Sequence, residues 1–322
     1  DNVLPPIVTG SVAIVIGIAL AGAAISMASY NWAIAFVTLV VTIAFSVYLQ
    51  GKGLIGMLPI LLGAVVGYII AAIMGIVDYT PIMREAWIRL PHITMPAFEN
   101  PMAWGTMLSI ALIAIATIPE STAHLYQISL YIDALAHEVG RPPLEIKKLI
   151  GLNLVCDGSN DTIAGFLGGS AGTNYGENNS LMAITRNFSV SVLFAAGVIA
   201  ILLGFIGKLA GVVNTIPVSV TGGLAIYLFG VIGMQGIALI QSERVNLFEP
   251  RQLAIGSTIL ILGIGGNLGL PDGLFPFIIP GLFPAGIPAI VFSALVGILL
   301  NVLFLLLKPA RFGVEERENI NY

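Results

Sequence analysis

Residues 168–186 read GGSAGTNYGENNSLMAITR and interrupt a strongly apolar chain with small, polar and acidic residues. The first half of this stretch is rich in glycine and the second half has the composition of a helix; between them stand Tyr175, Gly176, Glu177 and Asn178. Irregular backbone at membrane depth is tolerated where it is buried in protein or lines a cavity. A half-helix that begins there directs its free N–H groups at whatever occupies the cavity. We therefore expect a broken membrane element that forms half of a binding site in a transport protein.

The composition of the chain is that of an integral membrane protein. Of its 322 residues, 57% are hydrophobic and only 9% are charged, whereas soluble domains carry about 25% charged residues. The few charges fall mostly between apolar runs and leave no basic face, so we expect membrane lipid and no nucleic acid as a partner. The single cysteine, Cys156, excludes an intrachain disulfide.

The apolar runs predict ten membrane crossings, because each crossing needs about 20 apolar residues. The expected crossings cover residues 7–27, 33–49, 54–77, 105–126, 149–167, 168–186, 190–206, 217–239, 253–270 and 287–307. Residues 78–104 are expected to form a polar loop, and residues 133–148 a charged connection. The prolines between positions 271 and 288 predict a broken or re-entrant hairpin before the last crossing.

The distribution of Lys and Arg predicts which side of the membrane each loop faces. With a cytoplasmic N-terminus, ten of these residues lie inside and only Arg84, Arg89 and Lys208 lie outside. This bias agrees with the positive-inside rule. Ten crossings return the chain to the same side. We therefore expect a multi-pass protein of the cell inner (cytoplasmic) membrane, with both termini of this chain in the cytoplasm.

Two pairs of segments indicate an internal repeat. Residues 5–14, PPIVTGSVAI, are similar to residues 217–226, PVSVTGGLAI, and a weaker likeness joins residues 58–67 to residues 287–297. The partners are seven crossings apart, an odd number, so the copies are expected to be inverted in the membrane, as in many secondary transporters. Crossings four to seven then lack counterparts, and we expect four further crossings to precede Asp1.

Glu120 and His124 lie four residues apart, on one face of the expected fourth crossing. An ionisable group at this depth costs several kcal/mol unless it is paired, protonated or wetted. A carboxyl group that gains and loses a proton there can couple proton movement to transport. It can also hydrogen-bond the N–H and C=O groups of a heterocycle. The alternative interpretation is a buried pair with a purely structural role.

Glu177 lies at or near the start of the expected half-helix, where the helix dipole favours a negative charge. Two carboxyl groups from different crossings, those of Glu120 and Glu177, would suit a planar ligand rich in amide groups. The alternative is that Glu177 only caps the helix. Asp157 and Asp161 are also four residues apart. They could join a proton path or line a wet cleft, but we favour a position near the surface for this pair.

These residues resemble the motifs of a known family. The run NYGEN at residues 174–178, followed by MAITR at residues 182–186, resembles the signature of the nucleobase–ascorbate transporters (nucleobase:cation symporter-2). It is most similar to the pattern TxYGENxGVMAITR of the branch of that family that transports uracil. Glu120 with His124 is similar to the Glu-x-x-x-His pair of the family, and the resemblance extends across nearly all of the chain.

The resemblance implies an architecture of about fourteen crossings in two inverted repeats of seven, divided into a core domain and a gate domain. Residues 1–104 would then be the first-repeat part of the gate, residues 105–216 the second-repeat half of the core, and residues 217–322 the second-repeat part of the gate with a cytoplasmic tail. The fold class is all-α with a short strand at the broken helix, around residues 170–175. About ten crossings would be present in this chain, which is expected to form a homodimer through the gate domains.

The resemblance also implies a function, which is proton-coupled uptake of a nucleobase, uracil, by an elevator-type movement of core against gate. The implied roles are base binding by Glu120, Tyr175, Gly176 and Glu177, proton coupling by Glu120 and His124, and support of the site by Asn178 and Thr185. The proton is the coupling ion, and no cofactor or metal is expected. An enzyme is not expected, because no HExxH or serine-elbow motif accompanies the glutamates.

The choice of base is the least determined part of this interpretation. Ser180, Pro119 and Ser121 depart from the family pattern. Members that are specific for purines usually carry Gln where Glu177 stands, which favours a pyrimidine such as uracil. The alternatives are a symporter for xanthine, uric acid or another purine, and an anion exchanger or channel on the same fold. The two glutamates count against an anion carrier.

Overall fold

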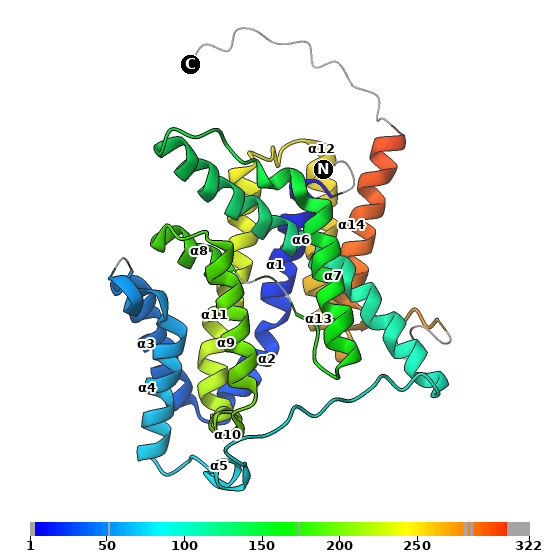
Figure 1. Ribbon diagram of the computed structural model, residues 1–322. Helices are drawn as coiled ribbons and strands as arrows, with labels where there is room; N and C mark the ends of the chain where they lie inside the picture. Colours follow the sequence, from blue (N-terminus) through cyan, green and yellow to red (C-terminus); the bar gives the residue numbers. More distant parts are fainter. Residues whose placement is uncertain are drawn as a thin grey trace.

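The computed structural model describes residues 4–50, 52–172, 174, 176–279, 283 and 286–307, and most of its elements are helices (Figure 1). The first half of the chain contains α1 (Pro6–Ala19), α2 (Ala21–Ser29), α3 (Trp32–Tyr48), the 3-10 helix η1 (Gly53–Met57), α4 (Pro59–Ile73), α5 (Thr80–Arg84), α6 (Pro101–Glu138), the 3-10 helix η2 (Ile146–Leu149) and α7 (Ile150–Phe166). The second half contains α8 (Gly176–Thr185), α9 (Val190–Gly204), α10 (Gly207–Asn214), α11 (Val218–Ser242), α12 (Pro250–Leu260), the π-helical η3 (Ile261–Gly265), α13 (Gly266–Gly269), the 3-10 helix η4 (Pro271–Gly273), β1 (Leu274–Phe275), β2 (Ile287–Pro288) and α14 (Ala289–Leu306).

Several of these helices can cross a membrane. Among the described residues, four continuous helical stretches are long and apolar enough by length and composition: Pro6–Ser29, Val218–Ser242, Pro250–Gly269 and Ala289–Leu306. The helices α3, α4 and α9 are apolar but shorter. The prediction of a mostly helical, multi-pass membrane protein is confirmed, whereas the number of ten crossings stays a prediction.

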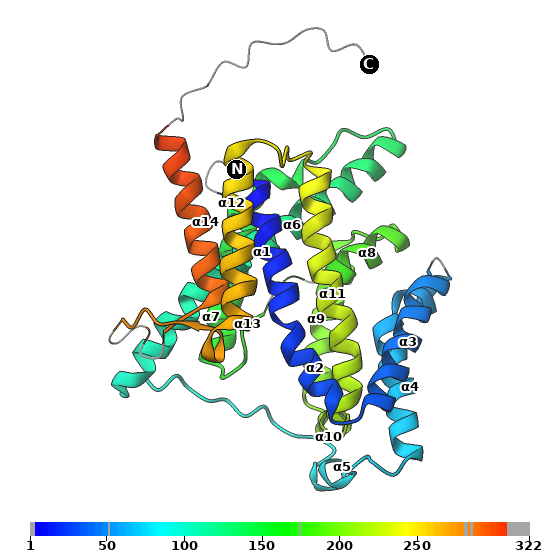
Figure 2. The same cartoon turned by 180° about the vertical axis from the view of Figure 1, so that it is seen from behind.

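The helices α1 and α2 pack along α11 in the opposite direction (Figure 2). The contacts run from Gly10 against Gly236 to Ala28 against Gly222, so residue numbers rise along one partner as they fall along the other. Glycine allows this close approach, because a Cβ atom on Gly17 would lie 2.6 Å from the carbonyl oxygen of Phe229. Small residues at such contacts let membrane helices approach closely.

A second set of contacts joins α1 to α12 and α14. Their apolar side chains form one buried cluster, made of Ile7, Val8, Val12, Val15, Ile255, Ile259 and Ala294. On the other side of α11, α3 packs against α4 and both contact α11. The residue before α3, Asn31, caps this helix, since its side chain accepts a hydrogen bond from the N–H of Ile34 at 3.2 Å.

Three expectations about segment boundaries were wrong in detail. The expected crossing 54–77 is divided at Pro59 into η1 and α4, because proline suits the first turn of a helix and not its interior. The helix α6 continues to Glu138, beyond the expected start of a charged connection at residue 133, and ends before Gly140, whose φ of 71° favours glycine. The expected loop 78–104 contains α5 and the first turn of α6.

The proline-rich segment before α14 interrupts the helices, as its prolines predict, and its re-entry into the membrane stays a prediction. Its described residues form a short antiparallel pair in which β1 lies beside β2, with Leu274 opposite Pro288 and Phe275 opposite Ile287. Proline occurs here at a strand end, where it interrupts no long ladder. The residues of this segment at 280–282, 284 and 285 lie outside the described part.

Two connections meet at the end of the bundle that carries α5 and α10. Ile88 forms an isolated β-bridge with Ile206. The N–H of Arg89 donates to the carbonyl of Phe205 at 2.9 Å, and the N–H of Gly207 donates to the carbonyl of Trp87 at 3.1 Å. The segment that leads into α6 is therefore tied to the segment that leaves α9.

Substitution of Gly63 tests the packing of α4 on α3. A Cβ atom on Gly63 would overlap the hydroxyl of Thr42, so we expect Gly63→Ala to lower the free energy of unfolding by about 1–3 kcal/mol. The matched control is Gly22→Ala in α2, where a Cβ atom would meet nothing within 4 Å. That variant is expected to gain up to about 1 kcal/mol from helix propensity. Thermal unfolding of the detergent-solubilised protein measures both changes, and equal melting temperatures for the two variants would contradict this packing.

Candidate functional site

The helix break before α8 lies where the sequence predicts it. The helix α7 ends at Phe166, Gly168 takes a φ of 80°, and α8 begins at Gly176. The described residues between them, up to 172 and at 174, form neither helix nor strand. The strand expected around residues 170–175 is therefore not seen in the described part of this segment. A strand needs a neighbour to pair with, and Gly172 instead donates its N–H to the Asp161 carboxylate at 2.7 Å.

The start of α8 packs against the middle of α6. Asn179 is only 9% exposed, and its side-chain amide donates to the carbonyl oxygen of His124 at 2.9 Å. The same amide lies 3.4 Å from the Gln127 side-chain oxygen. Since Asn179 follows Glu177 by two residues and His124 follows Glu120 by four, both predicted acidic positions lie within about one helical turn of this contact.

The structure describes the backbone of most predicted site residues, but it does not describe all of their side chains. Glu120 lies within α6, and Gly176 and Glu177 lie in the first turn of α8. The side chains of Glu120 and Glu177, and all of Tyr175, lie outside the described part. How the two carboxyl groups are placed relative to each other therefore stays a prediction.

The two predicted supporting residues differ in their surroundings. Asn178 is exposed at the surface of α8. The hydroxyl of Thr185 donates to the carbonyl of Leu181 at 2.8 Å, so its described hydrogen bonds stay within its own helix. At the end of α8, Arg186 forms an exposed ion pair with Glu138 of α6 at 3.0 Å. Exposed pairs of this kind contribute little to stability.

Ser121 connects α6, α7 and the broken segment. It is 1% exposed, and its hydroxyl donates to the Asp157 carboxylate at 3.1 Å. It also accepts hydrogen bonds from the amides of Asn153 at 3.2 Å and Asn174 at 2.5 Å. The sequence analysis did not predict these hydrogen bonds. The spacing of Asn153, Asp157 and Asp161 along α7 is the pattern that could have indicated them. Three polar residues four apart share one face of a helix.

This connection changes the interpretation of the two aspartates. Asp157 is half-buried and bonded to Ser121, and Asp161 holds the backbone of the broken segment at Gly172. Both carboxylates therefore help to position the segment that leads into α8, and a role in a proton path stays a prediction.

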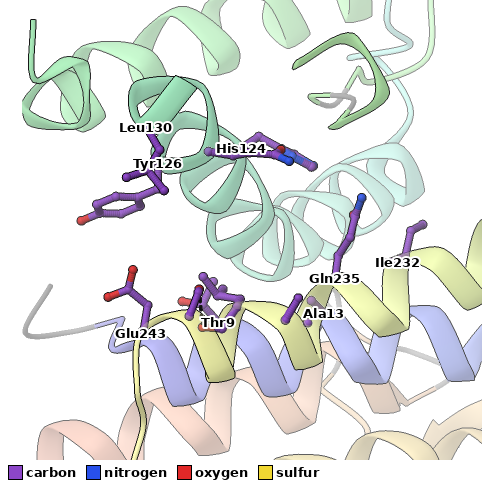
Figure 3. A pocket seen from close by; sticks show the side chains of 13 residues that line it. Thr9, Ala13, His124, Tyr126, Leu130, Ile232, Gln235 and Glu243 are labelled. Atoms are coloured by element: carbon purple, nitrogen blue, oxygen red, sulfur yellow. Dashed lines mark hydrogen bonds between the residues drawn. The ribbon is translucent and has the colours of Figure 1, made fainter. Parts of the chain in front are cut away.

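A cavity of about 230 Å³ lies between α6 on one side and α1 and α11 on the other (Figure 3). Most of its lining is apolar. Its polar members come from α1, α6, α11 and the residue that follows α11, and are Thr9, His124, Tyr126, Gln127, Gln235, Ser242 and Glu243. No group of His, Cys, Asp and Glu side chains in the described residues could hold a metal ion. The cavity is thus suited to a small organic molecule that makes a few polar contacts.

The fold and this site define a multi-pass membrane protein with a broken helix and with a cavity between α6 and the pair α1 and α11. The model of the Permease family matches residues 1–271. The chain belongs to this family, and the resemblance to the nucleobase–ascorbate transporters is confirmed. It is a transporter and not an enzyme.

Curated relatives are similar over most of the chain. The uracil permease of Bacillus caldolyticus is 36% identical over 314 residues, which cover 94% of this chain and 68% of the relative. The uracil permease of Bacillus subtilis (strain 168) is 30% identical over 334 residues, which cover 99% of this chain and 72% of the relative. That of Escherichia coli (strain K12) is 36% identical over 288 residues, which cover 84% of this chain and 63% of the relative.

Removal of the Ser121 hydroxyl tests the connection between α6 and α7. Ser121→Ala leaves one carboxylate and two amides with fewer hydrogen bonds in a half-buried position, so we expect a loss of about 1–3 kcal/mol in the free energy of unfolding. Ser159→Ala is the matched control, since the Ser159 hydroxyl is exposed and bonds only to the Val155 carbonyl of its own helix. Melting temperatures of the two purified variants give the answer. If Ser121→Ala and Ser159→Ala have the same melting temperature, the hydrogen bonds of Ser121 do not stabilise the fold.

Proposed function

We propose that the full-length protein carries a nucleobase, uracil, into the cell together with a proton. The relatives that match most of this chain are named uracil permeases, and the chain spans between 63% and 72% of their length. The observation that carries the proposal is the hydrogen bond from Asn179 to the His124 carbonyl. It fixes the start of the broken helix α8 against the part of α6 that contains Glu120 and His124.

In this proposal the base binds at the N-terminal end of α8. Free N–H groups at a helix start attract electron-rich oxygen atoms, and Tyr175 and Gly176 supply the backbone that shapes the site. The carboxyl groups of Glu120 and Glu177 pair with the N–H and C=O groups of the base. Asn178 supports α8 from its first turn, and Thr185 supports it from its last residue.

Proton coupling is assigned to Glu120 and its neighbour His124. The proton affinity of a carboxyl group in a membrane depends on whether water reaches it. It therefore changes each time the site opens to one side of the membrane or closes. When Glu120 is protonated it donates a hydrogen bond to the base, and when it loses the proton on the cytoplasmic side the base is released. The proton is the coupling ion, and the proposal needs no resident cofactor.

Alternating access is assigned to an elevator-type movement of the core, residues 105–216, against the gate, residues 1–104 and 217–322. Two similar segments begin α1 and α11, where Pro5 and Pro217 are the residues before the first helical turn. Gly17 follows Pro5 by the same number of residues as Phe229 follows Pro217, so the two positions are equivalent. Gly17 lies against the carbonyl oxygen of Phe229. This antiparallel crossing supports an inverted repeat in the gate. The proposal places both termini of this chain in the cytoplasm and pairs two gate domains in a homodimer.

Transport by purified full-length protein in liposomes tests the coupling. We expect uracil to accumulate when the lumen is alkaline relative to the medium, and a protonophore to abolish the accumulation. The variant Glu120→Gln, which cannot ionise, is expected to retain exchange of labelled for unlabelled uracil while it loses gradient-driven accumulation. Accumulation that does not respond to the pH gradient would rule out proton coupling.

The variant Glu177→Gln tests the choice of base. Replacement of a carboxylate that pairs with the base is expected to lower uracil uptake about tenfold to a hundredfold, which corresponds to about 1.4–2.8 kcal/mol. Uptake of xanthine is expected to rise in the same variant, since an amide at this position is typical of purine carriers. Competition between labelled uracil and unlabelled xanthine measures the shift. Unchanged selectivity would show that Glu177 does not select the base, and transport of sulfate or bicarbonate instead of any base would favour the anion carrier.

A further inference from the structure

The cavity between α6 and the pair α1 and α11 has two ends. Glu243 and Tyr126 lie toward one end, and His124 and Gln235 lie toward the other (Figure 3). Glu243 directly follows the last residue of α11, and Thr9 lies in the first turn of α1, so the first end opens where these helices begin and finish. The second end approaches the part of α6 to which α8 is bound through Asn179. The cavity therefore extends from that surface toward the part of α6 that contacts α8.

Gln235 is an unusual residue for its position. It lies within the apolar helix α11, more than a turn from the end of that helix. Among the described residues its side-chain amide has no hydrogen-bond partner, and it extends from α11 toward α6 (Figure 3). The side chain is exposed rather than buried, and it lines the cavity. Such a group is tolerated in a membrane protein where it faces water or a ligand in a cavity.

The neighbours of Gln235 hold it in place. The next residue, Gly236, is buried, and a Cβ atom on it would lie 2.6 Å from the Gly10 carbonyl oxygen. The helix α11 is thus pressed against α1 at this point. A side chain that projects from Gln235 therefore belongs to a fixed wall of the cavity, opposite the wall formed by α6.

The facing wall carries a second amide that is already oriented. The Gln127 side-chain nitrogen donates to the Tyr131 hydroxyl at 3.2 Å, and its oxygen accepts from Asn179 at 3.4 Å. Gln127 is thereby part of the α6–α8 contact, whereas the Gln235 amide remains available to a guest. A primary amide presents a donor and an acceptor side by side. This pattern is complementary to the N–H and C=O groups of a cyclic amide, as in the paired contacts of Gln with nucleic-acid bases.

We propose that Gln235 is a specificity-determining contact on the gate side of the cavity, which hydrogen-bonds the cyclic amide edge of the base as it passes between α8 and the cavity mouth. The inference rests on the proposed function and adds to it a residue outside the core. Gln235 selects heterocycles in which an N–H lies next to a C=O. It disfavours analogues in which a methyl group replaces the N–H hydrogen.

Transport kinetics of Gln235→Leu in the full-length protein test this proposal. The matched control is Gln241→Leu, because Gln241 is an exposed glutamine of the same helix that does not line the cavity. We expect the KM for uracil to rise about tenfold in Gln235→Leu with a small change in kcat. We also expect the discrimination between uracil and its N-methylated derivatives to fall. The control keeps the KM and the discrimination of the unaltered protein.

A chemical readout covers the case in which Gln235→Leu folds poorly. Gln235→Cys is made in a background with the native cysteines replaced, including the exposed Cys156 of this chain. Saturating uracil is expected to slow the reaction of this thiol with a water-soluble maleimide at least fivefold, whereas the same thiol reacts unhindered in the presence of fully N-methylated uracil.

The outcomes separate this inference from the proposed function. If the unaltered protein transports uracil while Gln235→Leu behaves like Gln241→Leu, and uracil leaves the labelling rate of Gln235→Cys unchanged, Gln235 does not contact the base and only this inference fails. If the unaltered protein neither transports nor binds uracil, the proposed function fails and this inference fails with it.

Discussion

The break between α7 and α8 depends on hydrogen bonds that replace those of a continuous helix. Within a membrane, backbone N–H and C=O groups need partners from the protein itself or from a wet cavity. Here Asp161 accepts from the backbone at Gly172, and Asn174 binds the buried hydroxyl of Ser121. Asn179 then ties the first turn of α8 to the backbone of α6 at His124. The helix start that the proposed function needs is held by these side chains, which come from α6, α7, α8 and the segment between α7 and α8.

The side of the cavity that α1 and α11 form is built on a different principle. The helices α1, α2 and α11 are joined through glycine at close range, as at Gly17 and Gly236. Such packing offers few alternative arrangements, because a displaced helix loses many contacts at once. The wall formed by α1 and α11 is therefore rigid, and Gln235 extends from it toward the wall of α6 that is linked to α8.

Much of the fold could be predicted from the sequence, because its signals are local. The break before α8 follows from glycine and polar residues in an apolar run, and the starts of α1 and α11 follow from similar segments after Pro5 and Pro217. The length of α6 was missed because the residues after 126 are amphipathic rather than apolar, and helix formation needs no membrane. The short pair of β1 and β2 was missed because its two strands are only two residues long.

The site was less predictable, because its contacts join residues far apart in the chain. Ser121 and Asn174 are 53 residues apart, and Asn179 and His124 are 55 residues apart, so no periodicity reveals them. The sequence motif indicated α6 and α8 but not the side chains that hold them together, and Gln235 carried no sequence signal beyond its polarity. The most direct measurement is an experimental structure of the full-length protein with its base bound. We predict that the base lies between the N-terminal end of α8 and the face of α6 that bears Glu120 and His124. A base bound at any other place, or α8 separated from α6 in that structure, would contradict this account.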